Sequence, residues 1–314
     1  FVQTGWTPLS VEDVSSLCPD ELPNSSCNGG SLLGFDMATY RDTVYLSPCA
    51  NWTISWDICC RNSSLNVTGT PGLYVETTLN NLNGACNAAP SFADHKVPMV
   101  CLGQPVSFDA SAMEPDGDQL TYALIDARFA SPAPLPVNYQ PGFNGETPFT
   151  GMAIDPESGL ITFTPTVVGA IIVSVEVTER GSASEVKGTV MRDMLFVVTA
   201  CSNQPPSATS GTITTASGSA TMVGDRAVEV CGIQPFCATI TISDPDIGQA
   251  LSISSDLGVP GLGLSINGTN PVVVELCSES TPVGEYSVWI VATDNGCPVV
   301  AARTYQYTIV VNAE

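Results

Sequence analysis

Apolar and polar residues alternate in short runs along most of the chain, and clusters of Gly, Pro, Asn or Asp separate these runs. A period of two with many β-branched residues is typical of strands that bury one face. One stretch differs, because Val11–Leu17, preceded by Ser10 as a cap, predicts a short helix. The rest predicts an all-β protein with strands at Val106–Phe108, Leu160–Thr164, Ile171–Val177, Met194–Val198, Ala238–Ile242, Tyr286–Ala292 and Tyr305–Val311.

The chain contains an internal repeat. Glu114–Leu120 (EPDGDQL) recurs as Asp244–Leu251 (DPDIGQAL), and Thr164–Gly169 (TPTVVG) recurs as Thr281–Gly284 (TPVG). In both copies the second segment is followed by a strand, a polar hairpin and a last strand, which indicates one module that occurs twice. The first copy is longer, and the Pro-rich segment Ser131–Thr150 is the predicted place of its extra residues.

The length of 314 residues fits two or three domains of about 100 to 150 residues each. One boundary is expected near Val97 and Pro98, where the first unit ends. A second is expected in Ser202–Pro206, a polar and Pro-rich segment suited to a semi-rigid linker. The sequence thus predicts a Cys-rich β domain over residues 1–98 and two β-sandwiches over residues 99–201 and 202–314.

Charge and composition narrow the range of functions. With 9 Lys and Arg against 31 Asp and Glu, the net charge of −22 would repel nucleic acid and anionic lipid, so neither is expected as a partner. No apolar run approaches the length of a membrane span, and we expect no membrane insertion. The chain opens at Phe1 without a signal-peptide hydrophobic region, so we expect mature or excised material.

Twelve cysteines, a single histidine and no paired Cys-x-x-Cys spacing predict disulfides formed in an oxidising, extracellular compartment. Cys101 and Cys201 flank the middle domain, and a bond between them would close it. Cys59 and Cys60 would lie on opposite faces of a strand, which predicts two different partners. The first domain has six cysteines with many alternative pairings, and the third has four that can pair internally: Cys18, Cys27, Cys49, Cys59, Cys60 and Cys86, then Cys231, Cys237, Cys277 and Cys297.

The middle domain resembles a known class of module. Pro105–Phe108, Glu114–Tyr122 and Ile154–Pro165 resemble the bacterial cadherin-like and PKD-like immunoglobulin-type modules that occur in tandem in surface proteins. The resemblance implies three immunoglobulin-like or cadherin-like β-sandwich domains in a row, stapled by disulfides.

The flanking domains extend this resemblance. Leu46–Trp56 and Cys60–Asn62 look like the segment before such modules in large secreted proteins of Bacteroidota, and Asp294–Pro298 is similar to the module that follows. Those proteins include gliding-motility adhesins exported by the type 9 secretion system. The resemblance implies a cell-surface location.

An acidic turn is the candidate metal site. Glu114, Asp116 and Asp118 place three carboxylates on one turn, and hard oxygen ligands of this kind suit Ca²⁺. The turn is not an EF-hand, because Ile125 stands where that loop needs a bidentate Glu. The cadherin-like resemblance implies calcium with help from Asp109 and Asp155. The alternative is that Pro-Asp-Gly forms a turn without an ion. A weaker cluster in the third domain consists of Asp244, Asp246 and Asp294.

No catalytic site is expected. His95 is the only histidine, and a serine or cysteine nucleophile would need such a base, so His95 reads as an exposed linker residue. Trp52, Trp56 and Tyr45 could form a sugar-binding platform, although such residues more often fill a sandwich core. Asn-x-Ser/Thr sequons begin at Asn24, Asn51, Asn62, Asn66 and Asn267, and the Bacteroidota resemblance implies O-glycosylation at Thr43.

These features predict an extracellular structural or adhesive element without enzymatic activity. In one interpretation the modules belong to a large surface adhesin, whose partners are further modules of the same chain and a glycan or other surface ligand. In a second, the chain is the repeating subunit of a filament, joined to identical subunits by strand addition at sheet edges or at termini such as Thr304–Glu314. A third interpretation is a carbohydrate-binding accessory region of a secreted enzyme.

Overall fold

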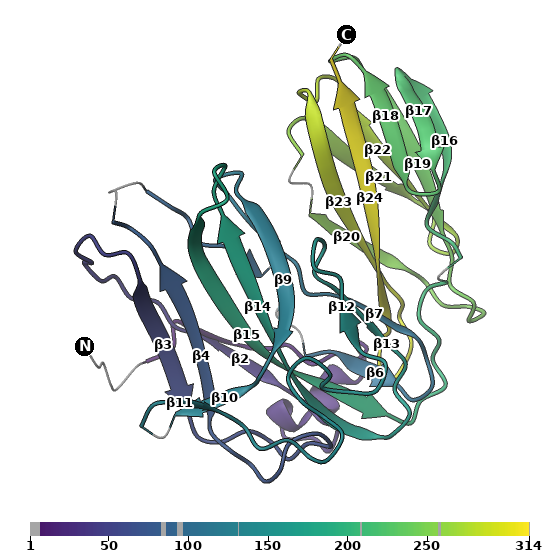
Figure 1. The fold of residues 1–314 in the computed structure, drawn as a ribbon. Coiled ribbons are helices and arrows are strands. Elements are labelled where there is room, and N and C mark those ends of the chain that lie inside the picture. Colours follow the sequence, from purple (N-terminus) through teal and green to yellow (C-terminus); the bar gives the residue numbers. More distant parts are fainter. Residues whose placement is uncertain are drawn as a thin grey trace. The chain divides into compact units, whose positions relative to one another are not determined.

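A computed structural model describes residues 7–82, 86–92, 97–130, 132–207, 209–256 and 259–313. The chain forms two compact units, Phe1–Cys201 and Ser202–Glu314, called here the N-terminal and C-terminal units (Figure 1). Strands make up nearly all of the regular structure, so the all-β prediction is confirmed. Each unit is described by itself.

The C-terminal unit is a sandwich of two sheets. Its first sheet has the order β16 (Thr212–Gly218), β19 (Phe236–Ile242), β22 (Val272–Ser278) and β21 (Leu262–Asn267). Its second has the order β17 (Ala220–Gly224), β18 (Ala227–Cys231), β24 (Ala302–Asn312), β23 (Gly284–Thr293) and β20 (Ser252–Asp256). Alternate side chains of both sheets meet in one apolar core, in which Ile240, Val274, Ile290 and Tyr305 are fully buried.

The strand order of this unit is that of an immunoglobulin-type sandwich. In that topology the first, second, fifth and fourth main strands form one sheet, and the third, sixth and seventh form the other. The sheet β16-β19-β22-β21 follows the first order and β20-β23-β24 the second, while β18 runs parallel to β24 at the edge.

The N-terminal unit contains a second sandwich with the same order. Its large sheet contains β9 (Gln119–Ile125), β14 (Gly169–Arg180) and β15 (Val186–Thr199), with β6 (Met99–Cys101) parallel to β15. The facing sheet is β12 (Ala153–Ile154), β13 (Leu160–Phe163) and β7 (Val106–Asp109), and β5 (Ser91–Phe92) pairs with β8 (Ala112–Met113). Phe163, Phe196 and Phe108 meet edge to face in the core between the sheets. The repeat seen in the sequence is therefore a repeat of strand order.

Residues before position 98 add strands to this sandwich. β4 (Leu73–Leu79) pairs with the first half of β15, and β3 (Trp52–Ile58) pairs with β4 along its whole length. The edge of β4 opposite β3 also pairs with β10 (Arg128–Ala130), and β11 (Pro134–Pro136) pairs with β10. The sheet therefore has eight strands. The expected boundary at residue 98 therefore does not separate two compact units, because the first strands need the long β15 as a partner. The boundary after Cys201 does separate them.

The Pro-rich insertion covers the outer face of the large sheet. Val137 from this insertion packs with Val67, Ala127 and Ile172 in a small buried cluster, and Val67 forms an isolated bridge with Tyr139. Asn66 is fully buried beside this cluster, where its amide donates to the Ile172 carbonyl at 2.7 Å and accepts from the Ile172 amide at 3.0 Å. The insertion and the N-terminal segment thus stabilise each other.

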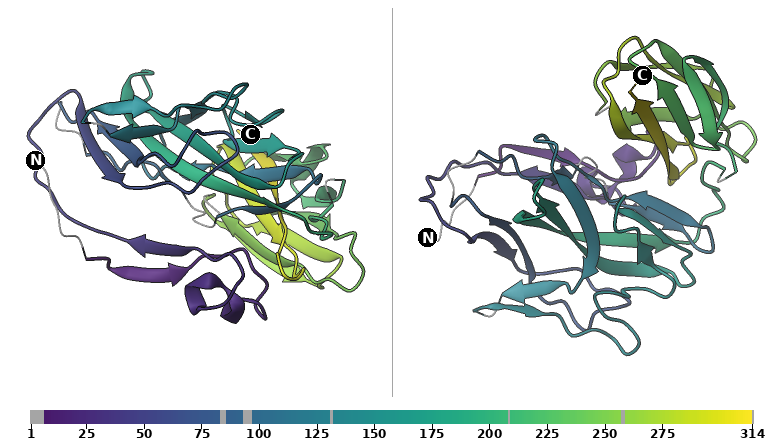
Figure 2. Two further views of the ribbon diagram at one scale, coloured as in Figure 1. Left: turned by 90° about the horizontal axis from the view of Figure 1, so that it is seen from below. Right: turned by 45° about the horizontal axis from the view of Figure 1, so that its top comes forward.

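Residues 7–40 form a separate small layer (Figure 2). The helix expected over Val11–Leu17 is wrong, because β1 (Ser10–Asp13) is extended and pairs antiparallel with β2 (Asp36–Thr39). The only helical turns among the described residues are the 3₁₀ segments Leu22–Asn24 and Ser26–Asn28 between these strands. Pairing with β2 outweighs the local capping signal of Ser10.

Disulfides join distant and neighbouring cysteines. Cys101 on β6 is bonded to Cys201, and Cys237 on β19 is bonded to Cys277 opposite it on β22. Two expectations were wrong. Cys59 and Cys60 are bonded to each other, because β3 ends at Ile58 and the alternation of a strand no longer separates them. The cysteines of the C-terminal unit do not all pair internally, because Cys231 is an exposed free thiol, as Cys27, Cys49 and Cys86 are free in the N-terminal unit.

Candidate metal centre

Glu179 has an unusual position for a charged residue. Val173, Val175 and Val177 point into the core from β14, and Glu179 continues the same face at the end of the strand with an exposed fraction of 1%. Pairing with β9 places it opposite Leu120, next to the acidic turn that leads into β9. A carboxylate that follows three valines at period two was a signal in the sequence, and the sequence-based prediction missed it.

Three carboxylates meet at this point. Glu114, Asp118 and Glu179 each offer one oxygen, and these oxygens lie within 4.8 Å of one another. The turn itself is held by Glu114, whose carboxylate accepts the backbone N–H groups of Asp116 at 3.1 Å and Asp118 at 2.6 Å. Antiparallel pairing of β9 with β14 therefore brings together acids that are distant in the sequence.

Two buried oxygens at this site, one in the trio and one beside it, have no hydrogen-bond partner within the described ranges. They are Oε1 of Glu179 and Oδ1 of Asn87. The amide nitrogen of Asn87 donates to the other Glu179 oxygen at 2.9 Å. A buried acceptor without a donor costs about 1 to 3 kcal/mol. A cation that binds oxygen would stabilise this site, because it would compensate the carboxylates and give the unpaired oxygens a partner.

Lys187 also contacts the trio. Its Nζ forms an ion pair with Oδ2 of Asp118, and the two side chains keep exposed fractions of 29% and 9%. Lys187 lies at a β-bulge, since Glu179 pairs with Gly188 and Arg180 pairs with Val186. A bulge redirects a side chain away from regular alternation. In this structure the bulge occurs at the residue whose ammonium contacts the acidic turn, Lys187.

The charges of the trio are coupled. Burial raises the pKa of Glu179, the hydrogen bond from Asn87 offsets part of this increase, and the charges of Glu114 and Asp118 raise the pKa further. The contact with Asp118 raises the pKa of Lys187. An acid with a raised pKa stabilises the fold only while it is protonated, so this contribution is lost as the pH rises. At neutral pH the trio thus favours any cation that compensates Glu179.

The other predicted ligands have different roles. Oδ2 of Asp116 accepts the backbone N–H of Ala88 at 2.6 Å. Oδ1 of Asp155 accepts the hydroxyl and the amide of Ser158, both at 2.8 Å, and these bonds lower the pKa of Asp155. Oδ1 of Asp109 accepts the Ser111 amide at 2.8 Å. Asp109 is on β7 and Asp155 precedes β13, in the facing sheet, and neither belongs to the trio.

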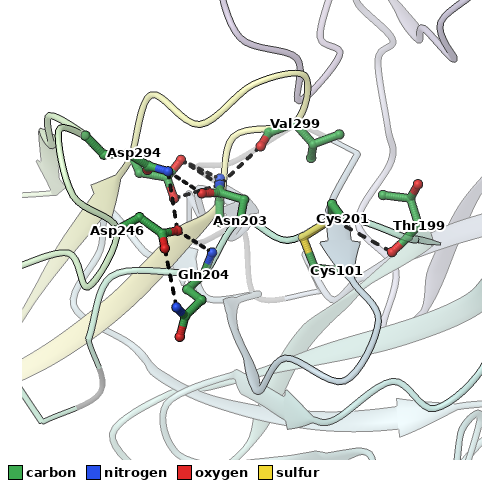
Figure 3. The surroundings of a disulfide bond; sticks show 10 residues. Cys101, Thr199, Cys201, Asn203, Gln204, Asp246, Asp294 and Val299 are labelled. Carbon is green, nitrogen blue, oxygen red and sulfur yellow. Dashed lines mark hydrogen bonds between the residues drawn. A yellow bond between two sulfur atoms is a disulfide. The ribbon is translucent and has the colours of Figure 1, made fainter.

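The C-terminal unit has a similar contact between an Asn and a buried carboxylate, like that between Asn87 and Glu179. Asn203, in the linker, donates to both oxygens of Asp294, at 3.0 and 2.9 Å, and to the Val299 carbonyl (Figure 3). Asp294 comes directly after β23, two residues beyond the buried Ala292, and Glu179 likewise comes two residues after the buried Val177 near the end of β14. The backbone N–H of the next residue, Gln204, donates to Asp246 at 2.7 Å, as Ala88 donates to Asp116. Each sandwich thus binds the segment that enters it through an Asn and the following amide.

The acids of this second cluster accept N–H donors. Asp294 also accepts the amides of Gly296 and Ala301, both at 2.9 Å, and Asp246 accepts Gln204 through both oxygens. Asp244 differs, because its Oδ2 is buried without a hydrogen-bond partner in the described part of the chain. Burial raises the pKa of Asp244 to about 6, and the charges of Asp294 and Asp246 contribute.

Replacing Asp244 by Asn is expected to stabilise the C-terminal unit at pH 7.5 by about 1 to 2 kcal/mol. The wild-type carboxyl contributes stability below its ordinary pKa of 3.8, and this contribution is lost as the pH rises through about 6. Hydrogen exchange of β23 peptides between pH 4 and 7.5, corrected for the intrinsic exchange rate, measures the effect. The variant should lack the fall in stability, while Asp225→Asn at an exposed acid should retain it. An equal fall in both would contradict the assignment.

The aromatic residues of the predicted platform differ in exposure. Trp56 is half-buried against Tyr40, with ring centroids 5.1 Å apart, and the indole of Trp52 donates to the Ser47 carbonyl at 2.8 Å. Neither tryptophan belongs to the buried apolar clusters of the described residues, so the two side chains do not fill the sandwich core as expected. Tyr45 is fully exposed.

A cavity of about 400 Å³ lies in the N-terminal unit beside Arg61 and Asp193, and Phe35, Met37 and Cys60 contribute to its lining. The two charged side chains bind each other through the bond from Arg61 Nη2 to Asp193 Oδ2 at 2.6 Å. The two charges therefore compensate each other, and we assign no ligand to the cavity on their account.

The sequons differ in accessibility. Asn24, Asn51, Asn62 and Asn267 are exposed, and so is Thr43. Asn66 is an exception, because its amide nitrogen is buried and bonded to Ile172. In the folded protein this nitrogen is inaccessible to a glycosyltransferase, so the prediction for Asn66 was wrong. His95 lies outside the described residues.

Comparisons with known proteins give no family. No family model matches the chain, and no curated protein matches it. Solved structures with a similar arrangement include the titin domains Z1Z2 in complex with telethonin, at 13% identity and a TM-score of 0.24, covering 73% of this chain and 100% of that one. A Drosophila N-cadherin fragment, EC1-3, has 12% identity and a TM-score of 0.25, covering 80% of this chain and 78% of that one.

An endo-fucoidan hydrolase of glycoside hydrolase family 107 also aligns, at 12% identity and a TM-score of 0.22, covering 84% of this chain and 42% of that one. TM-scores of this size support no inference about function, and the strand order described above carries the fold assignment. Among the described residues, no helix has the length and apolar character needed to cross a membrane.

Proposed function

We propose that this chain is a tandem-module segment of an extracellular structural or adhesive protein. The observation that carries the proposal is the duplicated anchoring of the entering segment: Asn87 binds Glu179 in one sandwich, and Asn203 binds Asp294 in the other. A module that fixes its own entering segment suits a chain of modules, because the direction of each connection is then set by the module that follows. The bonded cysteines suit an oxidising, extracellular location.

Of the structural interpretations, we favour an adhesin of the kind found in gliding Bacteroidota over a filament subunit. Strand addition through the C-terminal segment would need a free strand there. β24 is paired on both sides, with β18 and with β23, and its core-facing residues are buried. Withdrawing it would expose the apolar core. No comparable observation favours a carbohydrate-binding accessory role.

We also propose that Ca²⁺ binds the trio Glu114, Asp118 and Glu179, with Asn87 as a neutral oxygen ligand. Donors that are all oxygen favour a hard cation over a transition metal. Asn87 belongs to the segment that enters the sandwich, whereas Glu179 ends its longest core strand. A bound ion would therefore strengthen the same connection that the hydrogen bond from Asn87 already makes. The calcium would be structural.

The location and size of the native protein test the functional proposal. Antibodies against this chain should label intact cells of the source organism, and the labelled polypeptide should run at several times 32.7 kDa on a reducing, denaturing gel. Labelling that appears only after permeabilisation would overturn the extracellular role. Surface labelling with a band near the mass of this chain would overturn the adhesin interpretation in favour of a discrete subunit.

A further inference from the structure

Lys187 forms an ion pair with Asp118, a member of the trio, through its ammonium group. Its partner, Oδ2 of Asp118, belongs to the carboxylate that the proposed calcium ion would also need. The ammonium and a divalent cation would therefore compete for one ligand. Two unpaired oxygens, on Glu179 and Asn87, remain beside the ammonium-bound carboxylate.

The geometry allows the ammonium to leave without disturbing the sheet. The backbone of Lys187 is held at the bulge, where its carbonyl accepts the Asn80 amide at 2.8 Å. The side chain is flexible and still 29% exposed, whereas Asp118 is 9% exposed and stays with the turn. Moving the ammonium into solvent needs only side-chain rotations.

The charge balance favours an exchange. One ammonium cannot compensate three carboxylates whose oxygens lie within 4.8 Å of one another. A divalent cation brings twice the charge and can bind several oxygens at once. The ammonium, in contrast, is tethered and is always present at high local concentration.

We propose that Lys187 is a tethered counter-cation that occupies the acidic turn when Ca²⁺ is absent and is displaced when Ca²⁺ binds. The inference rests on the calcium site proposed above and adds its regulation. Displacement of the ammonium opposes binding, so the wild-type protein should respond to calcium in the high range typical of extracellular modules, about 0.1 to 1 mM. The turn would remain folded in both states.

The C-terminal unit supports this inference by contrast. At the equivalent position Asp294 accepts Asn203 and two backbone amides. The oxygens of Asp294 accept hydrogen bonds from fixed N–H donors, and calcium could bind there only by breaking these hydrogen bonds. In the N-terminal unit a flexible cation, Lys187, contacts the corresponding acids.

Calcium titrations of the full chain test the exchange. The chain has two lysines, Lys96 and Lys187, so selective ¹³C labelling at lysine Cε gives two signals, which Lys187→Met assigns. Affinity for Ca²⁺ is measured by calorimetry in the wild type, in Lys187→Met and in Glu179→Gln. Arg41→Met, which removes the same charge at an exposed position, is the matched control.

We expect wild-type binding, loss of binding in Glu179→Gln, and binding on the order of tenfold tighter in Lys187→Met than in Arg41→Met. The Lys187 signal should shift toward that of a solvated lysine as calcium is added. Binding with an unchanged Lys187 signal and equal affinity in Lys187→Met would overturn the exchange and leave the calcium site standing.

Two further outcomes separate the inference from the proposal on which it rests. Binding only in Lys187→Met would support the competition and overturn calcium binding by the native protein. Absence of binding in every variant would overturn both.

Discussion

Replacing Arg61 by Met is expected to lower the free energy of unfolding of the N-terminal unit by about 3 to 5 kcal/mol. The guanidinium is buried and binds both oxygens of Asp193, at 3.3 and 2.6 Å, and the carbonyls of Gly72 and Arg128. Without it Asp193, also buried, would keep the hydrogen bond from the Ser174 hydroxyl at 2.7 Å. Urea unfolding followed by hydrogen exchange of β14 and β15 peptides measures the loss.

Two controls separate the buried charge from general damage. Arg128→Gln removes a cation from the partly exposed pair with Glu76 and should cost less than about 1 kcal/mol. Arg61→Met combined with Asp193→Leu removes both buried charges and should cost less than Arg61→Met alone. A double variant as unstable as the sum of the two single variants would show that the two charges do not interact.

Removing the Cys101–Cys201 bond by changing both cysteines to Ala is expected to cost the N-terminal unit about 4 to 5 kcal/mol. The bond joins residues 100 positions apart, from β6 to the chain just after β15, so it restricts the unfolded chain over the whole sandwich. The chain-entropy model makes this cost grow with the length of the closed loop. Chemical denaturation of the oxidised proteins gives the difference directly.

The second disulfide is a matched comparison. Cys237 and Cys277 close a shorter loop of 40 residues between directly paired strands, so their removal should cost the C-terminal unit somewhat less. Reducing agent should destabilise the wild type at least as much as removing both bonds, because it also opens Cys59–Cys60. A loss below about 1 kcal/mol in the Cys101 and Cys201 variant would contradict a stabilising clasp.

Arg61 also shows why β3 and β4 belong to the same unit as the middle sandwich. Arg61 links the N-terminal segment to β15 through Asp193, and β4 uses the edge of β15 that β6 leaves free. β15 is long enough for both partners, with 14 residues. The N-terminal strands therefore complete a sheet edge that would otherwise be open to pairing with other chains.

Local pattern was sufficient for the strands of the sandwich cores. Ile171–Val177 and Tyr286–Ala292 alternate so regularly that their strand character and their buried faces follow from period two alone. The repeat of the acidic turn and of the strand after it likewise predicted a duplicated module, and both sandwiches have the same strand order. These features depend on residues that are close in the sequence.

The candidate site depended on contacts between distant residues. Asp118 was predicted from its turn. Glu179 comes close to it because β14 pairs with β9, and Lys187 contacts it beside the bulge in β15. Asn87 comes from the entering segment and binds Glu179. Asp109 and Asp155 have the same chemistry, yet they lie with the facing sheet. Which acids meet depends on strand register and on sheet, and neither is encoded in the spacing of the acids.

The sequence by itself determined the all-β class, the main core strands, the repeat and the linker after Cys201, because each of these depends on local alternation or composition. Only the tertiary structure decided that β3 and β4 share a sheet with the middle module, that Asn66 is buried and that Cys59 bonds to Cys60. These outcomes depend on which open sheet edge and which apolar face a segment finds, and on where a strand stops. Such partners lie many residues away, so their selection is a property of the packed chain.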